Sequence, residues 1–240
     1  MRFFDSLTDA NFVYFKDCYK ACGGHCCNAL SDDENILPML EPEFLSMKKN
    51  GGLNNIDFFH KTFVLKCGKS INIYFLICKN KGLCKPHKNR PLVCKIYPYF
   101  PLVSKYGEFL GVREISFYDL FYKDDKNHPC TLINLHKNEL LQMYKQNIQK
   151  IIKEPIMIFV FMVFEIIDRH LKSYFNQNFK NIFFDDLSKS EKKMFFKNNN
   201  LFLALKSNAF QDDINELYLS LESIYKNDIS RYFQTSDIKP

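Results

Sequence analysis

The sequence predicts an α+β fold that is predominantly α-helical, in which a cysteine-rich metal-binding half with a small β-hairpin packs on a C-terminal helical bundle. Three observations predict it. The chain has 240 residues, and 46% of them are hydrophobic, which is enough for a substantial core. All nine cysteines lie at or before Cys130. The hydrophobic pattern is β-like near residues 62–77 and helical after residue 130. We therefore divide the chain into a cysteine-cluster metal-binding domain, residues 1–130, and a helical region, residues 131–240.

Two helices are expected before the hairpin. The first spans residues 9–30 and carries cysteines at every fourth position, which lie along one helical face: Cys18, Cys22 and Cys26. The second spans residues 41–49. Pro42 suits its first turn, and the sequence Asn50-Gly51-Gly52 ends it.

The hairpin is expected from two runs rich in β-branched and aromatic residues, 62–67 and 71–77, which the turn sequence Gly68-Lys69-Ser70 separates. Residues 78–101 contain several Gly, Pro and Lys residues, so they predict an irregular loop region. Residues 112–122 show no clear period and are not assigned.

Four helices are expected in the C-terminal half: 138–152, 155–175, 188–197 and 212–229. The second of them is very apolar and is expected at the centre of the core. Ser188 and Glu191 have the spacing of a capping box, which predicts the start of the third.

The N-terminal residues and the apolar runs indicate a cytoplasmic protein. Asp5 and Asp9 precede any apolar run, which argues against a secretory signal. The longest apolar run, residues 155–164, is about half the length that a membrane-spanning helix needs. Nine cysteines in a reducing compartment favour metal or redox chemistry over a disulfide framework.

The positive charge is concentrated in one stretch. The chain has a formal net charge of +6, yet residues 58–107 contain no Asp or Glu and carry ten basic residues: Lys61, Lys66, Lys69, Lys79, Lys81, Lys85, Lys88, Arg90, Lys95 and Lys105. An anionic group, either inside the protein or on a partner, is therefore expected near this span.

The cysteine spacing indicates a metal site. The cysteines follow the pattern Cys18-x3-Cys22-x3-Cys26-Cys27, then Cys78-x5-Cys84-x9-Cys94, then Cys130. Thiolates are soft ligands that select zinc, Cu(I) or iron–sulfur clusters. Four thiolates around Zn²⁺ or an oxidised [4Fe–4S] core carry a formal charge of about −2, which the basic span would offset.

Adjacent Cys26 and Cys27 restrict the geometry of the site. On a helix their side chains diverge by about 100°, so they are poorly placed to bind one tetrahedral ion together. Either one of them binds metal and the other packs, or the site holds two metals or a cluster.

These motifs resemble the YkgJ-type cysteine-cluster family, also called the CxxxCxxCC zinc- or iron-chelating domain. The resemblance covers roughly residues 15–130 and rests on the N-terminal cysteine run together with the sequence CKNKGLCKPHKNRPLVCKIYP at residues 78–98. It implies seven ligands: Cys18, Cys22, Cys26, Cys27, Cys78, Cys84 and Cys94. The chain departs from the family pattern in having three residues between Cys22 and Cys26.

The resemblance implies two further expectations. Cys130 fills the place of a later family cysteine, but the Pro-Gly that usually follows is missing. Flagellin lysine N-methylases are similar over the same cysteine pattern and are associated with an iron–sulfur cluster. The expected activity is therefore metal binding that supports redox or methyl-transfer chemistry, with the catalytic residues unassigned.

Three functions are considered. The first is an iron–sulfur protein, with [4Fe–4S] favoured over zinc because seven or eight thiolates exceed what one structural zinc ion needs. The second is a zinc-stapled interaction module without catalysis, whose helical half contacts a protein partner. The third is a nucleic-acid-binding protein that uses the basic span 58–107, which is disfavoured because no recognised nucleic-acid-binding fold accompanies the span.

Several other residues have an ordinary structural interpretation. Cys67 is expected to pack in the hairpin as a small hydrophobic residue and not to bind metal. His25 and His87 lie beside cysteines, where a zinc ligand or an exposed turn residue is possible. The remaining histidines, including His170, belong to no motif in the sequence.

Overall fold

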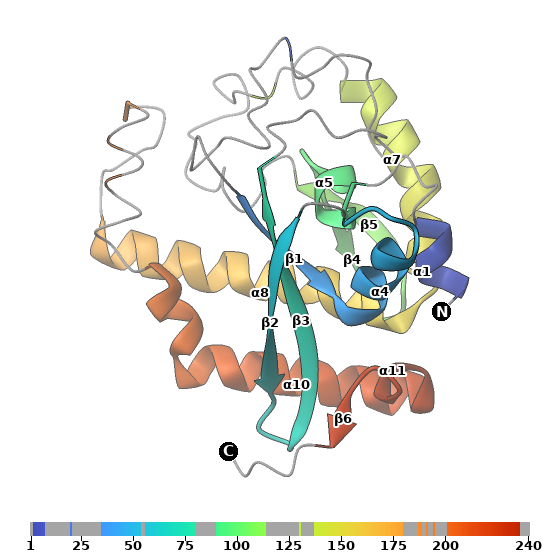
Figure 1. Cartoon of the computed structure of the whole chain (residues 1–240). Helices are drawn as coiled ribbons and strands as arrows, with labels where there is room; N and C mark the ends of the chain where they lie inside the picture. The colour runs from blue at the N-terminus through green and yellow to red at the C-terminus, as the bar shows by residue number, and fades with distance from the viewer. Residues whose placement is uncertain are drawn as a thin grey trace. The chain divides into compact units, whose positions relative to one another are not determined.

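A computed structural model gives the structure of the chain. It describes residues 2–7, 20, 35–53, 56–79, 90–113, 130, 137–179, 187–188, 191, 194 and 201–235 (Figure 1). The chain forms two compact units that are interleaved along the sequence. The first unit comprises Met1–Phe63, Asn72–Tyr99 and Pro129–Ile148, and the second comprises Val64–Ile71, Phe100–His128 and Gln149–Pro240. The division expected near residue 130 follows the distribution of cysteines and stays a prediction.

The fold class is α+β, and helices predominate in the described residues. The first unit contains most of an antiparallel sheet with the strand order β1-β3-β2, formed by β1 (Asn35–Leu40), β2 (Asp57–Val64) and β3 (Lys69–Cys78). β1 pairs with β3 from Asn35 opposite Cys78 to Leu40 opposite Ile73. The predicted hairpin is confirmed, but its first strand runs over residues 57–64 and not 62–67, and its second strand begins at Lys69, which was expected in the turn.

The core of the first unit lies between this sheet and α4 (Glu41–Lys49). Its buried side chains alternate along the strands and recur along the helix: Leu37, Met39, Phe44, Met47 and Leu76. Phe44 stacks on Tyr74 with ring centres 4.0 Å apart. α1 (Arg2–Leu7) contacts α4. The helix predicted at residues 41–49 is confirmed, with Pro42 in its first turn.

Two further helices complete the described part of the first unit. α5 (Leu92–Ile96) is a single turn within the region predicted to be an irregular loop, so that prediction is wrong for these residues. α7 (Lys137–Ile151), which confirms the helix expected at 138–152, belongs to this unit up to Ile148. The hydroxyl of Tyr144 donates to the carbonyl oxygen of Tyr99 over 3.1 Å, and both tyrosines are fully buried.

The second unit is built around the apolar helix α8 (Pro155–Asn178). This helix contacts β4 (Phe100–Val103), η5 (Leu201–Lys206) and α10 (Asn208–Tyr225). β4 pairs with β5 (Phe109–Arg113) in a hairpin that the sequence did not predict. The expected central helix at 155–175 is therefore confirmed as the largest element of this core.

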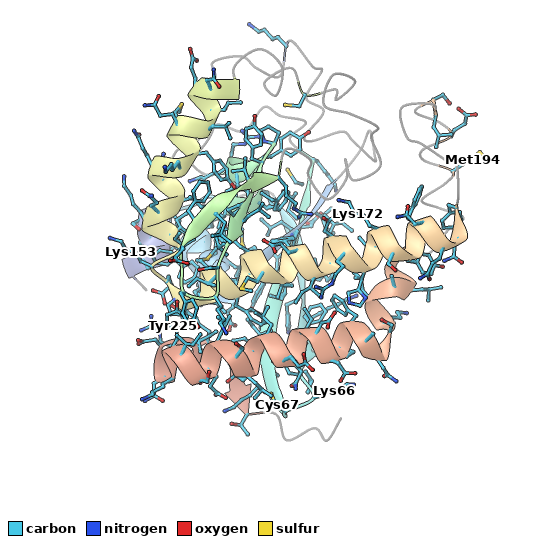
Figure 2. The ribbon with its side chains drawn as sticks, turned by 180° about the vertical axis from the view of Figure 1, so that it is seen from behind. Lys66, Cys67, Lys153, Lys172, Met194 and Tyr225 are labelled. Atoms are coloured by element: carbon cyan, nitrogen blue, oxygen red, sulfur yellow. The ribbon has the colours of Figure 1, made fainter. Side chains whose placement is uncertain are left out.

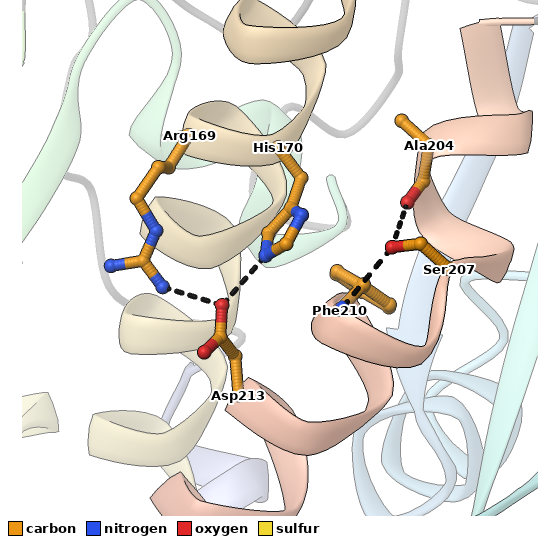
Figure 3. Close-up of polar contacts among 6 residues, drawn as sticks. All are labelled: Arg169, His170, Ala204, Ser207, Phe210 and Asp213. Carbon is orange, nitrogen blue, oxygen red and sulfur yellow. Dashed lines mark hydrogen bonds and ion pairs between the residues drawn. The ribbon is translucent and has the colours of Figure 1, made fainter.

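The last described elements of the second unit are two helices and a short strand. α10 begins earlier than predicted because Ser207 caps it, its hydroxyl accepting from the amide of Phe210 over 3.2 Å (Figure 3). After α10 come α11 (Asn227–Ser230) and the short strand β6 (Gln234–Thr235), which pairs with Lys69 and Ser70 at the start of β3.

The capping box predicted at Ser188 is confirmed. The amide of Ser188 donates to Glu191 over 2.7 Å, and the amide of Glu191 donates to the Ser188 hydroxyl over 3.3 Å. Most of the helix expected at 188–197 lies outside the described residues, as do the helix expected at 9–30, apart from Lys20, and the unassigned segment from residue 114 onward. Among the described helices, none combines the length and the apolar character that a membrane crossing requires.

Candidate metal centre

Cys78 stands at the end of the central strand of the first unit. It is the last residue of β3, and it lies opposite Asn35 of β1. The run of β-branched and aromatic residues from Ile71 to Ile77 favours a strand, which fixes the position of the cysteine that follows. Cys78 is half-buried, is in no disulfide, and packs against the Leu37–Leu76 cluster of the core.

Cys94 reaches the same cluster from a different element. It lies in α5, the helix that begins directly after the Arg90-Pro91 dipeptide of the family-like motif. Pro91 has the extended conformation that precedes a helix, and its carbonyl oxygen accepts from the amides of Cys94 and Lys95, each over 3.0 Å. Cys94 is half-buried and packs beside Val93 on the cluster that also contacts Cys78. The fold therefore packs these two predicted ligands against the same hydrophobic cluster.

Buried polar contacts fix the short helix that carries Cys94. The carboxylate of Glu43, on α4, accepts from the amide of Leu92 over 2.7 Å. Lys95 is only 3% exposed, and its ammonium donates to the carbonyl oxygen of Leu7 over 2.6 Å. Thus α5 is held on two sides, by α4 and by the end of α1.

Burial also changes the proton affinity of Glu43. Removal from water raises its pKa from 4.5 to about 7, while the Leu92 amide and the positive charge of Lys95 act in the opposite direction. The sequence analysis overlooked both Glu43 and Lys95. Lys95 counted only as one cation of the basic span, whereas its side chain is an internal anchor. A glutamate in the first turn of a helix gives no signal that distinguishes it from an ordinary surface residue.

Cys130 belongs to the same unit and is buried, at 3% exposure. Five of the predicted ligands lie outside the described residues: Cys18, Cys22, Cys26, Cys27 and Cys84. In the part of the chain that the structure describes, no three His, Cys, Asp or Glu side chains lie together as a metal-binding group. Cys78 and Cys94 are half-buried thiols, and thiols are the donor type that zinc and iron–sulfur clusters prefer.

Cys67 differs from these cysteines in both place and environment. It lies in the turn between β2 and β3, within the second unit, and it is exposed (Figure 2). Its backbone amide donates to the side-chain oxygen of Asn215 on α10 over 2.8 Å. The expectation that Cys67 packs as a buried hydrophobic residue is therefore wrong, because the turn is held by a polar contact.

A charged contact in the second unit was also missed. Asp213 of α10 binds two neighbouring residues of α8, the ring of His170 at 2.6 Å and the guanidinium of Arg169 at 2.8 Å (Figure 3). The hydrogen bond from His170 is the main cause that lowers the pKa of Asp213. Sequence spacing could not reveal this contact, since the residues are more than forty positions apart. It ties two core helices together.

The comparisons with known proteins give no match: no protein-family model, no curated protein and no solved structure is significantly similar to this chain. The resemblance to the YkgJ-type family therefore stays a prediction based on the cysteine motifs.

Proposed function

We propose that this protein binds a metal centre, a [4Fe–4S] cluster in preference to zinc, through the cysteines of its N-terminal half. The observation that carries the proposal is the convergence of Cys78 and Cys94. One ends a strand and the other lies on a one-turn helix, yet both pack on the same hydrophobic cluster. Partial burial beside apolar side chains limits solvent access, which favours a stable thiolate-bound cluster.

The cysteine pattern supports the iron–sulfur assignment. The remaining candidates, Cys18, Cys22, Cys26, Cys27 and Cys84, have the family-like spacing, with Cys130 as an additional candidate. The cytoplasm, where disulfides are rare, keeps the thiols of such a site reduced and able to bind metal. The cluster would supply one-electron chemistry or bind a reactant at iron, and methyl transfer to a protein substrate is the extension that the family resemblance suggests.

Elemental analysis of the full chain tests the proposal. Protein purified without oxygen, or reconstituted with ferrous iron and sulfide, is expected to hold about four iron and four sulfide per chain and to absorb broadly near roughly 400 nm. Colourless protein with stoichiometric zinc and no iron would replace the cluster by a zinc site and support a non-catalytic module. Protein that takes up neither metal contradicts the proposal.

Single cysteine variants test which thiols take part. Cys26→Ser, Cys84→Ser and Cys94→Ser are each expected to lose bound metal and to melt at a lower temperature, because site formation and folding are coupled. The matched control is Cys67→Ser, the same substitution at an exposed thiol of the second unit. It should keep its full metal content, and a clear loss of metal from this control would add Cys67 to the ligand set.

A further inference from the structure

The strand β2 has an unusual surface. Its first seven residues are all exposed, and it lies at the edge of the described sheet (Figure 1). Three of these seven are phenylalanines: Phe58 and Phe63 are each 46% exposed, and Phe59 is 37% exposed. Edge strands usually carry charged or polar side chains that prevent unwanted pairing. An edge with three exposed aromatic rings therefore indicates a binding surface.

The aromatic side chains of β2 divide between the two faces of the hairpin. Phe59 stacks on Phe75 of β3, with ring centres 5.0 Å apart and planes at 13°, and Phe63 lies 6.4 Å from the same ring. Phe58 contacts Tyr74 on the other face. Because side chains alternate along a strand, Lys61 shares the face of Phe59 and Phe63. We call the set Phe59, Lys61, Phe63 and Phe75 the aromatic face, and all four residues belong to the first unit.

The charge of this surface favours an anionic, stackable ligand. The ammonium of Lys61 lies 5.9 Å from the centre of the Phe59 ring. No carboxylate occurs in the sequence from Phe58 to Gly107. Asp57, at the start of the strand, lies 3.5 Å from the ammonium of Lys79. Aromatic rings next to a cation, on a strand whose one carboxylate pairs with Lys79, are suited to nucleobases that stack and phosphates that pair with the cation.

Other occupants fit the surface less well. An apolar peptide would leave Lys61 without a counter-charge. A duplex already has its bases stacked, so its bases are not available to the phenylalanine rings.

We propose that the aromatic face binds single-stranded nucleic acid. Bases stack on Phe59 and Phe63, Phe75 supports the two rings from β3, and Lys61 pairs with a backbone phosphate. Stacking accepts every base, so the binding is expected to have little sequence preference and to depend on salt. None of the four residues of the aromatic face is a candidate metal ligand, and the test does not depend on the metal content of the protein.

The test uses the full chain and a fluorescein-labelled oligothymidylate of about 12 nucleotides, with binding followed by fluorescence anisotropy at about 50 mM salt. Phe59→Ala and Phe63→Ala are each expected to weaken binding about tenfold, the loss typical of one base–aromatic stack. Lys61→Gln should reduce the slope of log affinity against log salt by about 0.7. Far-ultraviolet circular dichroism confirms that each variant is folded.

Tyr106, in the turn between β4 and β5, offers a matched control. It is 63% exposed, and the ammonium of Lys105 lies 5.3 Å from its ring centre, so it repeats the aromatic and cationic pair outside the aromatic face. Tyr106→Ala should bind as the unmodified protein does. Equal losses in Tyr106→Ala and the phenylalanine variants would show a general surface effect and overturn the proposal.

Three other results would overturn it as well. The first is absence of binding by the unmodified protein in dilute salt, where electrostatic contacts are strongest. The second is equal affinity for a duplex of the same length, which would remove the role of stacking. The third is an acidic peptide that binds as tightly and loses affinity in the same variants, which would assign the aromatic face to a protein partner.

Discussion

Glu43→Gln tests how the fold holds the helix that carries Cys94. Gln keeps the oxygen that accepts from the amide of Leu92, and it has nearly the same volume, but it cannot ionise. The substitution therefore leaves the packing of α4 against α5 in place and removes one titrating group. The expected effect is a change in how the free energy of unfolding depends on pH.

The sign and size of this effect follow from the pKa of Glu43. Its folded-state pKa, about 7, is higher than the 4.5 of an exposed glutamate, so the folded protein holds this proton more tightly than the unfolded chain does. The resulting contribution to stability is fully present below pH 4.5 and is lost as the pH rises through about 7. The loss amounts to about 3 kcal/mol, an order-of-magnitude figure for a fully buried group.

Urea unfolding of both full-length proteins at several values between about pH 4 and pH 8 measures this loss. The free energy of unfolding of the unmodified protein should fall, relative to that of Glu43→Gln, by about 3 kcal/mol across the window. Loss of metal at low pH affects both proteins and cancels in the difference. A difference that stays constant with pH would show that Glu43 is not buried against α5 as described, and would refute the reasoning.

Three further predictions test contacts within each of the two units. Asp213→Asn should make the stability of the protein less dependent on pH in the acid range. The hydrogen bond from His170 lowers the pKa of Asp213, so the stabilisation by this carboxylate is lost as the pH falls through that pKa. Acid unfolding followed by circular dichroism measures this, and a pH dependence equal to that of the unmodified protein would contradict the prediction. Tyr144→Phe should cost about 1 kcal/mol in urea unfolding through its lost hydroxyl bond, and an unaltered midpoint would argue against that bond. Gly107→Ala should lower the melting temperature more than Gly68→Ala. Both glycines have a positive φ, of +76° and +78°, but only at Gly107 would a Cβ lie 3.0 Å from a carbonyl oxygen. Equal losses in melting temperature would exclude that contact.

Local sequence signals predicted the helices well because their ends are chemically marked. Pro42 and the glycines after Asn50 define both ends of α4, and Pro155 precedes a long apolar run that forms α8. The strands were harder to predict. β1 contains Pro38, which argues against a strand because proline has no backbone N–H to donate. An edge strand tolerates proline where that position faces away from the neighbouring strand. β4 is likewise interrupted, by Pro101, and only pairing with β5 makes it a strand.

The sequence suggests the residues of the candidate site, but not the contacts that hold them in place. Spacing alone identified Cys78 and Cys94 as ligand candidates, since a family-like motif is local in sequence. Their common position on one hydrophobic cluster depends on β3 and α5 packing together with α4, which no local pattern encodes. Glu43 shows the same limit, because its role depends on an amide 49 residues away.

The anchoring of α5 has a consequence for the proposed metal centre. A helix of one turn is unstable alone, because nucleation fixes several residues for a single hydrogen bond. The position of Cys94 therefore depends on Glu43, Lys95 and the cluster against which it packs. A thiol that is held in place before a metal arrives loses less conformational entropy on binding. In the proposed metal centre, the buried contacts of α5 would therefore favour metal binding as well as folding, although none of their atoms is a proposed ligand.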